Sequence, residues 1–216
     1  MKKLINIKNN FNSLFKISHF VRMTFYRYKT SLWYKFFLME CGNNNLIMPP
    51  LYITPDSIII HNSVQIWYNA RIECIRSYSG DIFNPVVILH NNVSIQQNLH
   101  LTCASGVEID SNTAISANVT ITDIHHPYDN VDESIKNQKI ITKKVYIGKE
   151  CNVGNNVVIL PGTYIGNHTT VGANSVLQGT YPDYCVIVGS PAKIIKRYSI
   201  DKKIWLRTKP NGDFLD

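Results

Sequence analysis

Residues 121–134, "ITDIHHPYDNVDES", bring together the side chains of this chain that are best suited to proton transfer. Histidine titrates nearest to neutral pH, so His125 or His126 suits a general base that takes a proton from a weak nucleophile such as a hydroxyl. A carboxylate that binds the other ring nitrogen would orient the imidazole. Asp123 is our first candidate for that carboxylate, and Asp129 is the second.

The sequence on both sides of this stretch is regular and predicts the elements that hold the histidines. A period of six residues fits neither a helix nor a simple strand, but it fits short strands joined by tight turns, where Gly and Asn accept positive φ. Three such blocks close one triangular coil of about 18 residues, with the aliphatic side chains stacked inside. Fourteen aliphatic positions follow this count, in four groups: Ile60, Ile66, Ile72; Leu89, Ile95, Leu101; Ile109, Ile115, Ile121; and Ile147, Val153, Ile159, Ile165, Val171.

These blocks resemble the hexapeptide repeat of the left-handed parallel β-helix acyltransferases over roughly residues 58–198. The segments "NVTITDIHHPYD", "VYIGKECNVGNNVVILPGTYIG" and "YPDYCVIVGSPAKIIKRY" are similar to O-acetyltransferases of bacterial lipopolysaccharide and capsule synthesis, and more distantly to galactoside and maltose acetyltransferases. The resemblance implies a mainly β fold, a left-handed parallel β-helix. It also implies a homotrimer that transfers acetyl from acetyl-CoA to a sugar hydroxyl of a surface polysaccharide or its lipid-linked precursor.

The same resemblance assigns residues to the acceptor side of the site. It makes His126 the base, with His125 as a substrate contact or as the alternative base. The family's acceptor contacts match Gln96 and Asn98, whose amides suit hydrogen bonds to sugar hydroxyls, although such residues on a solenoid face are often plain surface. Tyr128 is placed with the acceptor contacts, and simple packing is its alternative role.

On the acetyl-CoA side, the resemblance rests on the later repeats. Lys193 and Lys196, in and after the "GSPAK" segment, are suited to bind phosphates, or else form a solvated end of the domain. Asn152 stands where the family usually has a tryptophan that shapes the acyl pocket, which leaves the identity of the acyl group open. The matching cofactor positions are Asn152, Asn155, Ala173, Gly189, Lys193 and Lys196.

Metal and thiol chemistry are not expected. Related β-helix carbonic anhydrases use two histidines five residues apart, and the fifth residue after His126 is Val131. Cys103 and Cys151 fall in inward-facing repeat positions, where a thiol is a small core residue. The five cysteines lie singly, which favours a reducing compartment, and the N-terminus lacks the apolar core of a signal peptide, so a cytoplasmic location is expected.

The organisation we predict is an N-terminal segment of residues 1–50, a β-helix domain of residues 51–198 with a long loop at 127–144, and a tail of residues 199–216. Residues 1–39 carry eight Lys or Arg and no acid, interleaved with aromatic residues, which predicts a basic, aromatic helix. Such a helix either caps the open end of the β-helix or makes a peripheral contact with an anionic membrane through residues 1–40. Nucleic acid is not an expected partner.

The amino-acid sequence leaves two other functions open. One is an N-acetyltransferase that acts on an amino sugar. The other is a catalytically inert β-helix that serves as a scaffold or sugar-binding module, and the missing tryptophan at Asn152 is its best support.

Overall fold

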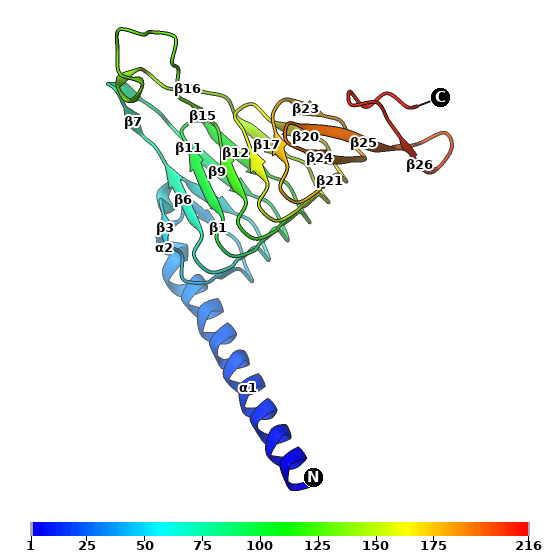
Figure 1. Ribbon diagram of the computed structural model, residues 1–216. Helices are drawn as coiled ribbons and strands as arrows, with labels where there is room; N and C mark the ends of the chain where they lie inside the picture. Colours follow the sequence, from blue (N-terminus) through cyan, green and yellow to red (C-terminus); the bar gives the residue numbers. More distant parts are fainter. Residues whose placement is uncertain (1, 216) are drawn as a thin grey trace.

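The computed structural model describes residues 2–215, and side chains from residue 13 onward. Its main body is a three-sided prism of parallel β-strands, with one long helix at the N-terminal end and an antiparallel extension at the C-terminal end (Figure 1). The chain runs round the prism from sheet A to sheet B to sheet C, and then begins the next coil. We name the three edges A–B, B–C and C–A after the sheets that meet there.

The strands of each sheet are short because each side of the triangle holds only one hexapeptide. Sheet A consists of β1 (Glu40–Cys41), β4 (Ile58–Ile60), β9 (Val86–Leu89), β12 (Gly106–Ile109), β17 (Val145–Ile147), β20 (Tyr164–Ile165) and β23 (Thr180–Tyr181). Sheet B consists of β2 (Leu46–Ile47), β5 (Gln65–Ile66), β10 (Ser94–Ile95), β13 (Ala114–Ile115), β18 (Asn152–Val153), β21 (Thr170–Val171), β24 (Cys185–Gly189), β25 (Ala192–Ser199) and β26 (Ile204–Arg207).

Sheet C consists of β3 (Tyr52–Ile53), β6 (Arg71–Cys74), β11 (His100–Cys103), β14 (Thr120–Thr122), β19 (Val158–Ile159) and β22 (Val176–Leu177). Two small antiparallel pairs lie outside the prism, β7 (Ser77–Tyr78) with β8 (Asp81–Ile82), and β15 (Ile124–His125) with β16 (Ile141–Thr142). The remaining elements are the 3-10 turns η2 (Pro55–Ser57) and η3 (Ile135–Asn137).

The core of the prism is the aliphatic stack that the six-residue count predicts. All fourteen counted positions are at most 2% exposed, and the parallel register places them above one another, as in Ile95 against Ile115 and Ile115 against Val153. Burial of each such side chain contributes about 1.5–3 kcal/mol relative to leaving it in water. The predicted repeat and its inward face are therefore confirmed.

The B–C edge is formed by a column of asparagines in the left-handed backbone conformation. Their φ angles lie between 58° and 61°, which Asn accepts more readily than most residues do. Each side-chain amide donates to the next side chain in the column, with distances between 2.9 and 3.3 Å, in the order Asn69, Asn98, Asn118, Asn156, Asn174. The column joins successive coils at this edge, in addition to the backbone hydrogen bonds that the same asparagines donate to the preceding turn.

The N-terminal helical segment comprises α1 (Lys2–Lys29), the π-helical turn η1 (Thr30–Tyr34) and α2 (Lys35–Phe37), as the basic, aromatic sequence predicts. Only its C-terminal end covers the first coil. Thr30 is fully buried and its hydroxyl accepts from the Ile47 N–H at 2.9 Å, while Leu38 packs into the core. The first coil begins at β1, ahead of the expected boundary at residue 51, because residues 40–53 pair in register without repeating the hexapeptide pattern.

The C-terminal end of the prism is closed by antiparallel pairing. The strand β24 turns back into β25, which pairs with β26, so the expected tail of residues 199–216 includes a strand of sheet B. This extension covers the last coil's edge, which would otherwise expose unpaired backbone groups.

We predict that Gly166→Ala destabilises the protein by about 1–3 kcal/mol in urea unfolding, because it overfills a packed turn. A Cβ at Gly166 would lie 2.4 Å from the Asp183 nitrogen, which belongs to the backbone of the next coil and cannot move freely. Gly106→Ala is the matched control. Its Cβ would meet only the flexible side chain of Lys144 at 3.3 Å, so its unfolding midpoint should stay close to that of the wild type. Equal midpoints for the two variants would contradict the prediction.

Candidate active site

The histidine-bearing loop leaves the prism at the C–A edge, directly after β14. The pairing of Ile124 with Thr142 closes its base, and the Asp123 carbonyl accepts from the Lys143 N–H at 2.8 Å. Inside the loop, the nearly buried side chain of Gln138 donates to the carbonyls of Asn130, at 2.8 Å, and Glu133, at 3.0 Å. The predicted excursion is thus a self-packed loop with a defined path.

A second excursion, the β7–β8 hairpin, leaves the same edge two coils earlier and supports the loop. The Tyr78 hydroxyl donates to the Lys136 carbonyl at 2.5 Å, and Lys139 forms a salt bridge to Asp81 at 2.5 Å. The His126 ring lies edge-on to the Tyr78 ring, with 5.4 Å between the ring centroids. His126 is exposed on the hairpin side of the loop.

His125, the last residue of β15, points to the other side of the loop. It lines a hollow of about 230 Å³ over sheet C, together with Ile141, Lys143, Pro161 and Gln178. The two histidines therefore face different spaces. His125 faces the outer surface of its own sheet C, and His126 faces away from it.

Asp123 does not contact His126 in the part of the chain that the structure describes. It is fully buried, and its carboxylate accepts from three backbone N–H groups, those of Ala104 at 2.8 Å and of Ser105 and Gly106 at 2.7 Å each. The Cys103 thiol donates to the same carboxylate at 3.5 Å. These bonds close the C–A turn of the preceding coil, so the geometry gives Asp123 a structural role in place of the expected orienting one.

The residues expected to bind acetyl-CoA lie at or near the B–C edge of the later coils. Asn155 and Ala173 occupy successive turns of that edge, and the Gly189 N–H donates to the Ser175 hydroxyl at 3.0 Å. Lys193 and Lys196 are exposed on β25. Asn152 is exposed on the outer face of sheet B, beside Ala114 and Thr170 in the neighbouring strands.

A groove across the outer face of sheet C connects the histidine loop with the "GSPAK" turn. Its larger hollow measures about 610 Å³, within the size range of small-molecule sites. Gln178 lines this hollow and also the smaller one beside His125, so the two adjoin. The lining of the larger hollow is Leu160, Val176, Gln178, Gly179, Tyr181, Ser190, Pro191 and Ala192.

The expected acceptor contacts are not gathered in one place within a single chain. Tyr128 is exposed and its ring lies 6.2 Å from that of His125. Gln96 is half-buried beside β10 of sheet B, away from the C–A edge. Both polar groups of the Asn98 side chain take part in the asparagine column, so Asn98 is a structural residue in this chain.

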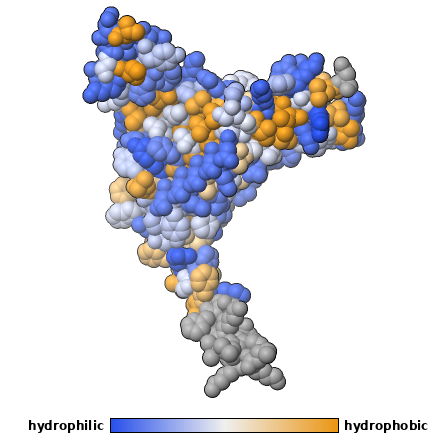
Figure 2. Space-filling view, viewed as in Figure 1, coloured by the Kyte–Doolittle hydropathy of each residue, from blue (hydrophilic) through white to orange (hydrophobic). Residues whose placement is uncertain are grey.

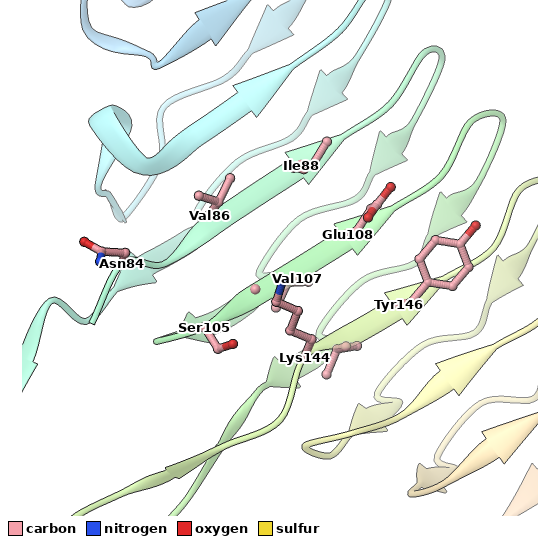
Figure 3. Close-up of a pocket in the computed structure, with 10 residues that line it drawn as sticks. Asn84, Val86, Ile88, Ser105, Val107, Glu108, Lys144 and Tyr146 are labelled. Carbon is pink, nitrogen blue, oxygen red and sulfur yellow. The ribbon is translucent and has the colours of Figure 1, made fainter. Parts of the chain in front are cut away.

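A further hollow of about 230 Å³ lies on sheet A, on the opposite side of the loop base (Figure 3). Gly106 leaves space between the side chains of Val86 and Lys144, which are its neighbours in the sheet. Glu108 binds the His90 ring at 2.7 Å, and the Tyr146 hydroxyl donates to Asp110 at 3.0 Å. Burial and this hydrogen bond raise the pKa of Tyr146, which keeps the phenol neutral.

The repeats also identify relatives of this chain. Residues 144–179 match the family model described as bacterial transferase hexapeptide (six repeats). In this part of its sequence the chain is similar to the hexapeptide-repeat transferases. Over 113 residues it is 37% identical to WbbJ of Escherichia coli (strain K12), a protein named for lipopolysaccharide biosynthesis and O-acetyl transfer, covering 49% of this chain and 58% of WbbJ.

Two other similarities extend this result. A Mycobacterium tuberculosis (strain ATCC 25618 / H37Rv) protein named as an acetyltransferase is 33% identical over 90 residues, covering 42% of this chain and 30% of that protein. This chain thus spans less than two thirds of the curated relatives it matches. A mutant of AntD, an N-acyltransferase from Bacillus cereus crystallised with dTDP and coenzyme A, superimposes with a TM-score of 0.62 at 21% identity, covering 76% of this chain and 86% of AntD. The likeness confirms the expected left-handed parallel β-helix.

The described part of the chain holds no cluster of three or more His, Cys, Asp or Glu side chains that could bind a metal ion. All five cysteines are free, and Cys151 is buried in the core. Burial raises the pKa of Cys151 to about 11, so its thiol stays protonated and unreactive at neutral pH.

Three residues beside the histidines could not be assigned from the sequence. Tyr78 lies in a hairpin outside the repeat, and only the "SYSGD" turn hinted at that hairpin. Lys143 and Gln178 line the groove from the end of the loop and from the end of the last hexapeptide. Nothing in a six-residue count distinguishes these outward-facing positions from ordinary surface.

We predict that Asp123→Ala lowers the free energy of unfolding by about 3–5 kcal/mol, because three buried N–H groups lose their acceptor. Asp129→Ala, in the exposed part of the loop, should leave stability unchanged and serves as the control. Urea unfolding followed by circular dichroism measures both. A stable Asp123→Ala protein that has lost only its activity would instead favour the orienting role.

Proposed function

We propose that this protein is an acetyl-CoA-dependent O-acetyltransferase that acts on a sugar hydroxyl of a surface polysaccharide, such as O-antigen or capsule, or of its lipid-linked precursor. The observation that carries the proposal is the groove over sheet C, which leads from His125 in the histidine loop to the "GSPAK" turn. The 37% identity to WbbJ, with its name, supports the reaction type and the class of acceptor.

The proposed reaction is a direct transfer with His126 as the general base. The imidazole takes the proton of the sugar hydroxyl while the oxygen attacks the thioester carbonyl, and the carbon–sulfur bond then breaks. The protonated imidazole returns the proton to the departing thiolate, so the products are the sugar acetate ester and free CoA. The exposed ring of His126 is accessible for this proton transfer, and the contact with Tyr78 limits its rotation.

The groove over sheet C suits the donor. Its lining is mainly apolar and small, from Leu160 and Val176 to Ala192, which fits a narrow chain such as pantetheine. Lys193 and Lys196 stand exposed near its far end as cationic donors for phosphates. Asn155, Ala173 and Gly189 lie at or near the neighbouring B–C edge, whereas Asn152, in the usual tryptophan position, lies on the outer face of sheet B.

The orientation of the two histidines favours a site shared between copies of the chain. His126 faces away from the groove of its own chain, so the base and a bound thioester would meet if the groove came from a neighbour. In a homotrimer, each loop would reach the next copy, and Gln96 of that copy would complete the acceptor side with His125 and Tyr128. We place the reaction in the cytoplasm, where acetyl-CoA is available and where five free cysteines are stable.

We predict that His126→Gln lowers the rate of CoA release by about 10²–10⁴-fold, the usual contribution of a general base. The assay follows free thiol from acetyl-CoA in the presence of candidate glycans, and the product should be an ester that hydroxylamine cleaves. His125→Gln is the matched control, and its main effect should be a higher KM for the acceptor. A larger loss of kcat for His125→Gln would identify His125 as the general base. Equal CoA release by the wild type and both variants would contradict the proposal that the protein is an acetyltransferase.

A second prediction concerns the shared site. Gln178→Trp should fill the groove and abolish activity, as His126→Gln does, because Gln178 lines both hollows. When the two inactive variants are co-expressed and the hybrid oligomer is purified through two tags, activity should partly return. A hybrid contains sites that combine an intact His126 with an intact groove from another copy. Inactive hybrids that retain the wild-type mass and unfolding midpoint would show that each site lies within one chain.

A further inference from the structure

Among the described side chains of the N-terminal helix, from residue 13 onward, those of residues 13–22 are all exposed. The helical segment is attached to the prism at its C-terminal end, where Thr30 of η1 is buried and Arg27 at the end of α1 donates to the Asn44 carbonyl at 3.2 Å. From there the helix extends away from the coils into open space (Figure 1). Capping of the first coil therefore accounts for the end of the helix and leaves the function of residues 13–25 unexplained.

The free part of the helix carries an exposed apolar stripe. The stripe follows a spacing of three, four or seven residues, which places its members on one side of the helix. Each member is more than half exposed: Leu14, Val21, Phe25, Tyr28 and Leu32. Orange and blue residues lie side by side on the coloured part of the helix in Figure 2. A continuous row of exposed apolar side chains on a protein surface marks an interaction site.

The charges around the stripe are of one sign. Residues 1–39 hold eight Lys or Arg and no acid. Among the helix residues whose side chains are described, no Lys or Arg forms a salt bridge, and Lys16, Arg22 and Lys35 are exposed. A partner that neutralises these charges must be anionic.

An apolar helical stripe fits either a bundle with other copies of the helix or the surface of a bilayer, and the charge pattern decides between the two. A bundle of several copies would bring the basic helices together without any acid to pair with, and like charges across such a bundle repel. An anionic bilayer surface supplies negative charge and an apolar layer at once. Phe, Tyr and Trp are the residues that suit this boundary, because they combine a large apolar ring with, in Tyr and Trp, a polar group.

We propose that residues 13–37 bind along the surface of an anionic phospholipid bilayer, with the apolar stripe inserted at the headgroup boundary and the basic side chains at the lipid phosphates. The helix would lie on the membrane, since none of the described helices combines the length and apolar character that crossing requires. The attachment of α1 through Thr30 and Tyr34 then holds the prism at that surface. This binding does not depend on the acetyl transfer proposed above.

The test is flotation of the full-length protein with vesicles of pure phosphatidylcholine and of equimolar phosphatidylcholine and phosphatidylglycerol. Wild type should float only with the anionic vesicles, and high salt should release it. Lys16→Glu/Arg22→Glu should weaken binding by at least about 30-fold, because each basic residue near the surface contributes about five-fold. Val21→Gln/Phe25→Gln, which keeps good helix formers in the stripe, should also lose binding.

Matched controls separate the helix from overall charge and overall apolarity. Lys149→Glu/Lys202→Glu makes the same change in net charge at exposed positions off the helix, and Ile82→Gln removes an apolar side chain that is 83% exposed. Both should float like wild type. Equal flotation of the helix variants and wild type would overturn the proposal. It would also be overturned if the helix variants changed the mass of the lipid-free protein in sedimentation, because the stripe would then join copies of the chain.

Discussion

The rest of the structure depends on the vertical stacking of one buried aliphatic residue per hexapeptide. Each side of the prism is too short to be stable as an isolated strand, so every rung relies on the rungs above and below. The parallel register places Ile95, Ile115 and Val153 in one column, which buries each of them completely. The asparagine column at the B–C edge performs the corresponding task for the turns, where a residue with positive φ is needed in every coil.

This constraint determines where the chain is able to leave the prism. The A–B and B–C edges are occupied by turns whose left-handed residues stack, and an insertion there would interrupt the column. The C–A edge carries both excursions, the β7–β8 hairpin and the histidine loop. Asp123 makes the second departure possible, because its carboxylate satisfies the N–H groups of Ala104, Ser105 and Gly106 in the turn of the preceding coil. The residue expected to orient the base thus fixes the point at which the loop begins.

The six-residue count was sufficient to predict the core, since a buried aliphatic in every block is what makes the prism stable. It could not predict the first coil at residues 40–53, where Leu46 and Ile47 pair in register without a regular repeat. The family resemblance placed Asn98 with the acceptor contacts, and the structure shows its side chain within the asparagine column. The positions of outward-facing polar residues follow no packing rule that a single sequence reveals. The places of Gln178 and Tyr78 beside the histidines are therefore known only from the structure.

The proposed functional segments lie at different edges and ends of the prism. The histidine loop occupies the C–A edge, the groove proposed to bind the donor crosses sheet C of the last coils, and the basic helix leaves from the first coil (Figure 1). His125, at the end of β15, lines the hollow over sheet C, whereas His126, the next residue, contacts Tyr78 of the β7–β8 hairpin. Because His126 faces away from the groove of its own prism, it reaches a donor groove most directly when a second copy of the chain lies beside the first.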